Sequence, residues 1–330
     1  MDSINDGARA VKRFRNILFV HQLAVDDPAA FQRAAVLAEE NSARLKVIEV
    51  LEERPADIGV PIALTDVLRN TLSEESREQM EQLVAPLRGK IDIKVQVITG
   101  TPFLEIIREV LRNHHDLVIK AADKGGLITR VFGSTDMHLL RKCPCPVWLH
   151  KHGHDRPYHR ILAAVDFDES RGAERAASTL NQDIMELATS VALREHSELY
   201  VGHAWYPKGA ELLQTRTHGL TKEEIEEYVN EALACNERRM NELMHRAESW
   251  VGRELWHKIR PQVRLIKGLA RRAIPELAEE LQIELIVMGT IAHAGIAGIL
   301  IGNTAETILN RIDCSVLTVK PEGFVTPVTL

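Results

Sequence analysis

The run Ile161-Leu162-Ala163-Ala164-Val165-Asp166 is short and aliphatic and ends in a carboxylate, and a similar run, Ile17-Leu18-Phe19-Val20-His21-Gln22, lies near the start of the chain. Short aliphatic runs of this kind are typical of strands buried on both faces of a parallel sheet. The same succession follows each run, so the chain contains an internal repeat. It consists of an amphipathic segment, at about 27–41 and 172–193, and then a second aliphatic run, at 45–51 and 199–205.

A long helix with a polar face is expected next in each half. We expect the first to begin near Ser73, because Glu74 and Glu75 would then lie in its opening turn, where carboxylates favour the helix dipole. The second should begin at Thr221 and run to about Trp250, because Thr221 and Glu224 form a capping-box pattern.

The remaining elements also occur twice, and strands that alternate with helices of ten or more residues predict βαβ units with right-handed crossovers. We therefore predict five strands and four helices per half, in two tandem doubly wound domains with five-stranded parallel sheets. We place them at residues 1–155 and 156–330, joined by a linker at 150–157. The repeated segments are strands at 91–99 and 263–267 that run into Gly100 and Gly268, helices at 103–112 and 272–281, strands at 116–119 and 284–288, and terminal strands at 145–149 and 314–318.

Composition limits the classes of function. The chain of 330 residues has a net charge of −6, which argues against a general nucleic-acid-binding surface, and we expect the basic stretch Arg9–Arg15 to be a solvated arm. Neither a signal-peptide core nor a run near the roughly 20 apolar residues of a membrane span is visible. The expected location is the cytoplasm, with no membrane partner.

Several local sequences resemble the universal stress protein family, in particular its two-domain, E-type bacterial members. The resemblance covers about 15–152 and 158–321. In the C-terminal half, Gly289 and Gly302-Asn303 keep the spacing of the family's nucleotide motif, although Ala292 replaces a glycine and Asn303 a hydroxyl residue. The stretches that resemble the two-domain members are 116–120, 135–144 and 300–306.

The resemblance implies a candidate ligand site in the C-terminal half. The family uses an Asp after the first strand to hold a nucleoside, and here this is Asp166; Asp168 follows it closely. The remaining candidates are Gly289, Ala292, Gly302, Asn303 and Thr304, near a helix start where backbone N–H groups favour an anion. A purely structural alternative stays open, in which Asn303 and Glu306 form an N-terminal cap. No cofactor is assigned, and ATP in this half is the alternative to another small-molecule ligand.

In the N-terminal half the motif has drifted further. Gln22 occupies the Asp position, Lys120-Ala121 ends the strand, and Gly133-Ser134 is what survives of the motif. Lys120 could pair with a phosphate or with Asp123. We favour a degenerate site retained for packing.

Metal binding and catalysis find little support in the sequence. Cys143, Cys145 and nearby histidines have no standard zinc spacing, and Cys145 corresponds to Cys314 in the repeat, which suggests buried apolar side chains. His138 and His293 lie in or beside the two loops and could contact phosphate or be solvated. No nucleophile–base pattern or Walker loop is visible, so we expect no enzyme.

The resemblance also implies how the halves associate. In this family the terminal strands commonly pair two domains, so the strands near 146–150 and 314–319 should pair within this chain. The expected function is a stress-response binding or scaffold module, with a homodimer as the expected assembly. The alternative is a nucleotide-responsive switch or slow ATPase that uses the C-terminal half.

Overall fold

The computed structural model describes residues 14–23, 25, 27–52, 62–123, 132–153, 156–167, 174–207, 221–291 and 302–330. Each half alternates strands with helices, and the terminal strand closes each repeat. The N-terminal half contains β1 (Asn16–Val20), α1 (Pro28–Asn41), β2 (Arg44–Glu52), α2 (Ile62–Val84), a short 3₁₀ turn (Ala85–Leu87), β3 (Ile93–Gly100), α3 (Pro102–Asn113), β4 (Leu117–Ala121), α4 (Ser134–Lys142) and β5 (Val147–His150).

The C-terminal half follows the same order of strands. It contains β6 (Arg160–Ala164), α5 (Glu174–Glu195), β7 (Glu198–Trp205), α7 (Lys222–Val251), α8 (Arg253–Ile259), β8 (Gln262–Lys267), α9 (Ala270–Glu280), β9 (Leu285–Gly289), α10 (Asn303–Leu309) and β10 (Ser315–Val319).

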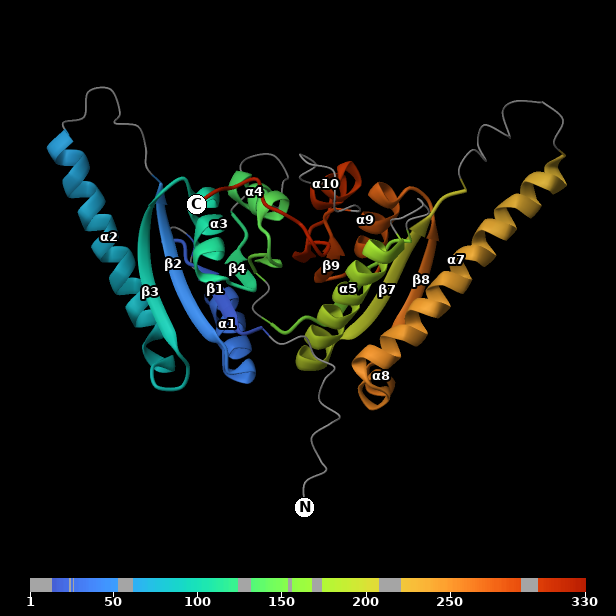
Figure 1. Ribbon diagram of the computed structural model, residues 1–330, viewed down its shortest axis with the longest axis horizontal. Coiled ribbons are helices and arrows are strands. Elements are labelled where there is room, and N and C mark those ends of the chain that lie inside the picture. Colours follow the sequence, from blue (N-terminus) through green and yellow to red (C-terminus); the bar gives the residue numbers. More distant parts are fainter. Residues whose placement is uncertain are drawn as a thin grey trace, which may run out of the picture.

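The described strands form one continuous sheet in the order β3-β2-β1-β4-β5-β10-β9-β6-β7-β8 (Figure 1). Strands within each half are parallel, and the two halves meet where β5 and β10 pair antiparallel. In this pair Leu149 lies opposite Val316 and Trp148 opposite Leu317. The expected pairing of the terminal strands within one chain is therefore confirmed.

Two apolar layers cover the faces of this sheet, and both continue from one half into the other. One layer packs α1, α2, α5, α7 and α8 against one face, with Trp148 and Leu317 at its centre. The other packs α3, α4, α9 and α10 against the opposite face, with Leu149 and Val316 at its centre. The alternation of side chains along β5 and β10 thus makes both strands part of each layer.

Polar contacts outside the sheet also join the halves. Arg141 of α4 forms an ion pair with Glu306 of α10. The C-terminal segment crosses to the N-terminal half beside α3 (Figure 1), where Arg108 Nε donates a hydrogen bond to Thr329 O at 3.1 Å.

Most predicted elements lie within a few residues of their expected positions, but two expectations were wrong. Helix α2 begins at Ile62, directly after Pro61 in the sequence, and not near Ser73. No glycine or proline lies between Ile62 and Val84, so nothing in this stretch interrupts a helix before Ser73. The C-terminal half has more than four helices, because Gly252 at φ 91° ends α7 and α8 begins at the next residue.

The start of α7 matches its expectation. Thr221 caps the helix, its hydroxyl accepts from the Glu224 N–H, and the Glu224 carboxylate accepts from the Thr221 N–H. Across the residues described above, no helix combines the length and apolarity that a membrane span needs.

Candidate functional site

A cavity of about 300 Å³ lies at the carboxyl ends of β6 and β9 in the C-terminal half. These two strands are adjacent and parallel. The chain leaves β6 towards β7 on one side and leaves β9 towards β10 on the other, so the cavity lies at a topological switch point. Doubly wound α/β folds bind ligands at this place.

Five of the six predicted site residues line this cavity. Asp166 follows β6, Gly289 ends β9, and the other three lie at the start of α10; they are Gly302, Asn303 and Thr304. Ala292, Asp168 and His293 lie outside the described residues. The spacing of the motif thus predicted which described residues converge, and their role in binding stays a prediction.

The backbone at Asp166 is held by Asn181 of α5, which is buried. The Asn181 side chain donates to Asp166 O at 2.8 Å and accepts from the Asp166 N–H at 3.3 Å. The Asp166 carboxylate is 77% exposed and lies 3.9 Å from Nδ1 of His203. Asp166 therefore has a fixed backbone and a carboxylate at the rim of the cavity, open to solvent.

The two motif glycines serve different purposes in the structure. A Cβ at Gly289 would lie 2.7 Å from Leu180 Cδ2, so this glycine allows α5 to approach the end of β9 closely. A Cβ at Gly302 would have 3.8 Å to its nearest neighbour, Thr290 O. The Gly302 N–H donates to this same oxygen at 2.9 Å, which ties the start of α10 to the end of β9.

The capping role considered for Asn303 was wrong. Gly302 is the residue that caps α10, in an extended conformation, and Asn303 is the first residue of the helix. Glu306 accepts from Arg141 of the other half, so its side chain is used in an interdomain ion pair and not in a capping box.

The lining of the cavity is mainly apolar. Among the described lining residues Asp166 is the only charged side chain, and the polar groups beside it come from Asn181, Thr290, Asn303 and Thr304. Apolar side chains make up most of the rest: Leu180, Ile184, Ile274, Met288, Ile291 and Ile308. The arrangement offers an apolar body with a polar rim.

In the N-terminal half an ion cluster occupies the positions that match Met288, Ile291 and Ala305, and a separate cavity of about 420 Å³ lies at the carboxyl end of β1 beside α1 and α2. The pairs Val20–Lys120 and Ala164–Met288 occupy matching positions in the sheet, so Lys120 corresponds to Met288. The buried Lys120 Nζ donates to Asp123 Oδ1 at 2.5 Å and to Asp136 Oδ1 at 2.9 Å. Counting along the repeat, Asp123 and Asp136 correspond to the cavity-lining Ile291 and Ala305.

Backbone donors complete this ion cluster of Lys120, Asp123 and Asp136. The Asp136 carboxylate accepts from the N–H groups of Asp123 at 2.7 Å and Gly133 at 3.2 Å. Burial raises the pKa of Asp136, and the charge of Lys120 opposes that rise. A Cβ at Gly133 would lie 2.5 Å from Asp123 Cβ, so the packing of Asp123 leaves no room for a side chain at this position. Of the two partners considered for Lys120, Asp123 is the one in contact.

Gln22, which replaces the Asp of the C-terminal half, is explained by the same cluster. Its Nε2 donates to Asp123 Oδ1 at 2.7 Å. An aspartate at this position would bring a second carboxylate against Asp123, and like charges at this distance are unfavourable.

Sequence inspection missed a buried polar pair behind the cavity. His203 of β7 contacts Val165 O at 3.1 Å through Nδ1 and Asn236 Oδ1 at 3.0 Å through Nε2. The pair joins α7 to the end of β6, directly before Asp166. A histidine within a mostly apolar strand was the available signal.

The N-terminal half has a matching polar anchor for α2. Glu49 of β2 accepts from Ser76 Oγ at 2.8 Å and contacts His21 Nδ1 at 2.6 Å. Burial acts to raise the pKa of Glu49, but the hydrogen bonds from His21, the Leu23 N–H and Ser76 outweigh it and lower the pKa.

Lys320, which follows β10, was also missed. It is buried, its ammonium donates to Leu140 O and to Thr290 Oγ1, and Thr290 lines the cavity. Burial lowers the pKa of Lys320 to about 7. The residue joins α4 of one half to the site of the other.

The cysteines and the histidine considered as candidate ligands pack against other parts of the protein. Cys145 and Cys314 are buried, as predicted, Cys143 is buried as well, and burial raises the pKa of Cys314 to about 12. His138 stacks on Phe103 with ring centroids 4.2 Å apart. Within the described ranges no group of three or more His, Cys, Asp or Glu side chains is arranged to hold a metal ion.

The repeated strands and helices, with a cavity at the strand switch point, define a tandem doubly wound α/β protein. The chain belongs to the Universal stress protein family, which matches residues 13–151 and 157–320.

Known proteins resemble it over nearly their whole length. It is 28% identical to Universal stress protein E of Escherichia coli (strain K12) over 326 residues, which cover 96% of this chain and 97% of that one. A Universal stress protein E homolog of Haemophilus influenzae is 27% identical, with coverage of 94% and 98%.

Solved structures show the same architecture. A putative universal stress protein from Pseudomonas aeruginosa UCBPP-PA14 superimposes with a TM-score of 0.61 at 26% identity, over 94% of each chain. A universal stress protein from Archaeoglobus fulgidus gives a TM-score of 0.59 at 18% identity, covers 92% of this chain and 98% of that chain, and supports the fold alone.

Proposed function

We propose that the protein is a non-catalytic binding module of the stress response with one small-molecule site, the cavity of the C-terminal half. One observation carries this proposal. At matched positions the C-terminal half has the apolar residues Met288, Ile291 and Ala305, which line a cavity, whereas the N-terminal half has the ion cluster. The two halves of the repeat therefore differ in the space and in the charge that they present at these matched positions.

The lining favours a ligand with an apolar or aromatic body and a polar end at Asp166. A single carboxylate with no cation beside it, among the described lining residues, is unfavourable for a polyphosphate, because like charges repel. A nucleoside base, or another small metabolite of low charge, fits this lining better. Such a ligand would bind through burial of apolar surface, with hydrogen bonds at the rim that fix its orientation.

The second candidate is a nucleotide-responsive switch or slow ATPase. It is supported by the convergence of Asp166, Gly289, Gly302, Asn303 and Thr304 on one cavity, at the spacing that resembles the family's nucleotide motif. The N–H groups at the start of a helix lack intrahelical partners and could contact a phosphate there.

Native mass spectrometry with adenosine and with Mg-ATP separates these candidates. The proposal predicts one ligand per chain and adenosine affinity at least equal to that of ATP. An ATP affinity tenfold or more above that of adenosine would favour the switch, as would measurable hydrolysis. Two ligands per chain would contradict the proposal of a single site in the C-terminal half.

Gly302→Val tests the cavity. We expect adenosine binding to weaken at least tenfold, because the new side chain enters the space that the ligand would occupy. The unfolding free energy should change by less than about 1 kcal/mol, because a Cβ at Gly302 meets no close neighbour and its backbone is extended. Isothermal titration and thermal unfolding measure the two quantities.

Thr304→Val and Thr307→Val provide a matched pair for the same titration. Thr304 lines the cavity, whereas Thr307 lies on the same helix and donates to Asn303 O. Thr304→Val should weaken adenosine binding and Thr307→Val should not. Equal affinities in wild type, Gly302→Val and Thr304→Val would refute the site.

We also propose that the chain forms a homodimer. Helix α2 exposes three large apolar side chains at neighbouring positions: Val67 at 59%, Leu68 at 53% and Leu72 at 42%. Exposed apolar clusters on soluble proteins often mark interaction surfaces. The mass of the intact assembly in the same spectra tests this, and a monomer at micromolar concentration would contradict it.

A further inference from the structure

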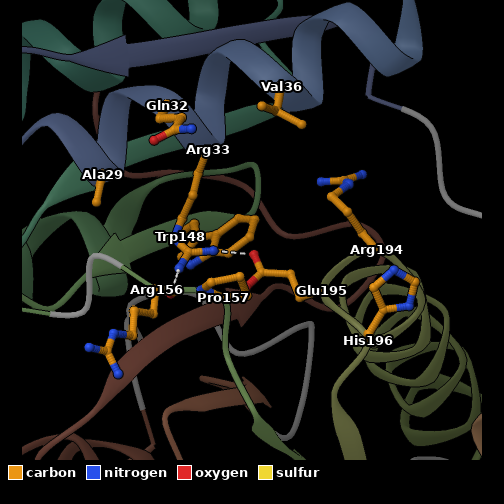
Figure 2. A pocket seen from close by; sticks show the side chains of 10 residues that line it. All are labelled: Ala29, Gln32, Arg33, Val36, Trp148, Arg156, Pro157, Arg194, Glu195 and His196. Atoms are coloured by element: carbon orange, nitrogen blue, oxygen red, sulfur yellow. Dashed lines mark hydrogen bonds and ion pairs between the residues drawn. The ribbon is translucent and has the colours of Figure 1, made fainter.

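The cavity of about 420 Å³ at the carboxyl end of β1, which we call the N-terminal cavity, lies between α1 and α2, and the proposed function does not use it. It differs from the cavity between the two halves of the chain, where the buried guanidinium groups are already paired. There, Figure 2 shows Arg33 of α1 joined to Glu195 of α5, and Arg194 pairs with Glu40. The N-terminal cavity, in contrast, is lined by a side chain with an unpaired polar atom.

This atom is Nε2 of His21, the residue that follows β1. His21 lines the N-terminal cavity, and its side chain is 14% exposed. Its Nδ1 lies 2.6 Å from Glu49 Oε2, whereas Nε2 has no hydrogen-bond partner among the described residues and keeps contact with solvent. The ring therefore presents an accessible, unpaired nitrogen to the cavity.

Glu49 fixes the orientation and the tautomer of His21. Its carboxylate lies behind the cavity wall and accepts from Ser76 Oγ at 2.8 Å and from the Leu23 N–H at 2.7 Å. An ionised carboxylate can only accept hydrogen bonds, so the proton of the neutral ring lies on Nδ1 and Nε2 carries a lone pair. A group held in this way loses little conformational freedom when it binds a hydrogen-bond donor.

The C-terminal half has a different arrangement at the matching positions. Val165 follows β6 as His21 follows β1, and His203 of β7 occupies the place of Glu49 in β2. There the imidazole of His203 contacts Val165 O, so the polar contact closes on the backbone. The fold therefore does not require an imidazole directly after the first strand of a repeat.

The rest of the lining is mainly apolar and carries little charge. Asp27 is the other ionisable side chain among the described lining residues, and its carboxylate lies 2.9 Å from Nδ1 of His152. An organic anion would meet this carboxylate, and like charges repel. The rings of Phe19 and Phe31, with centroids 5.3 Å apart, form an aromatic wall that favours an aromatic ligand.

We propose that the N-terminal cavity binds an uncharged phenol, an aromatic ring system that carries a hydroxyl group. The hydroxyl would donate to His21 Nε2, and the rings would lie against Phe19 and Phe31. A phenol is more acidic than an aliphatic alcohol and is therefore the better donor to an imidazole lone pair. A volume of 420 Å³ equals about fourteen water molecules in the liquid, which accommodates two fused rings. This ligand differs in chemistry from the one proposed for the C-terminal half and would bind independently of it.

2-Naphthol is the probe, and 2-fluoronaphthalene is its counterpart of nearly the same shape without a hydrogen-bond donor. Both are fluorescent, so the anisotropy of the probe during titration with the full-length chain measures binding. We expect 2-naphthol to bind about tenfold more tightly, because one hydrogen bond in an apolar cavity contributes a factor of this order. His21→Phe should remove this advantage and leave the affinity for 2-fluoronaphthalene unchanged, which also shows that the variant is folded.

Three further variants complete the experiment. His159→Phe makes the same substitution at a histidine that is 72% exposed and pairs with Glu284, and should bind both probes like wild type. Gln82→Trp, at an exposed lining position of α2, should fill the N-terminal cavity and weaken both probes. Gly302→Val, in the C-terminal cavity, should leave the 2-naphthol affinity unchanged. The proposal is overturned if the anisotropy of 2-naphthol does not rise, if 2-fluoronaphthalene binds equally well, if His21→Phe binds 2-naphthol like wild type, or if Gly302→Val removes the binding.

Discussion

Lys120→Met is expected to lower the free energy of unfolding by about 3–5 kcal/mol, because it removes the cation from a buried cluster with two carboxylates. Lys120 and Asp136 are both almost inaccessible to solvent. The substitution places the same residue in β4 that the C-terminal half carries in β9, Met288, so side-chain shape is not the cause of the loss. Chemical denaturation at pH 7, for wild type and variant, measures the effect.

The triple variant Lys120→Met/Asp123→Ile/Asp136→Ala is the matched control. It gives the N-terminal half the residues of the C-terminal half, and should be more stable than Lys120→Met alone, because no buried carboxylate remains without a counter-charge. A loss below about 1 kcal/mol in Lys120→Met would show that the cluster is solvated, and would remove the argument that the two halves differ at these positions.

Much of the fold could be predicted from the aliphatic runs, because strands buried on both faces of a parallel sheet have no room for polar side chains. The start of α7 could also be predicted, because the two residues of its capping box, Thr221 and Glu224, are only three positions apart in the sequence. The predicted start of a helix was wrong where the same residue types are compatible with two positions in it. Glu74 and Glu75 suit the first turn of a helix, but they suit the exposed face of its interior as well, and α2 begins at Ile62.

The site could be predicted in part, for a similar physical reason. Parallel strands bring their carboxyl ends to one edge, so motif spacing alone placed Asp166, Gly289 and Gly302 together. The ion cluster depends on a contact between β4 and the start of α4, and the sequence left two partners open for Lys120. The cavity between the halves combines residues as distant as Val36 and Arg194, which no local pattern connects.

Glu109→Gln is expected to lower the free energy of unfolding by about 3 kcal/mol at pH 7. Glu109 of α3 is buried and accepts from Asn113 Nδ2 at 2.7 Å, lies 2.5 Å from Lys46 Nζ, and contacts His115 Nε2 at 3.2 Å. Burial acts to raise its pKa, but the hydrogen bonds and charges of His115 and Lys46 outweigh it and lower the pKa to about 2. A lowering of this size from the ordinary glutamate pKa of 4.5 corresponds to the stated energy.

The contribution of Glu109 to the free energy of unfolding should depend on pH in a definite direction. Because the pKa of Glu109 is lower in the folded state, its contribution is fully present above about pH 4.5 and is lost as the pH falls towards 2. The difference in stability between wild type and Glu109→Gln should therefore shrink over this interval, whatever the other carboxylates contribute to each protein. Glu81→Gln, which breaks an exposed pair with Arg88, should cost less than about 1 kcal/mol at pH 7. A difference for Glu109→Gln that stays constant from pH 7 to pH 2 would show that packing, and not the ionised carboxylate, is what the glutamine disturbs.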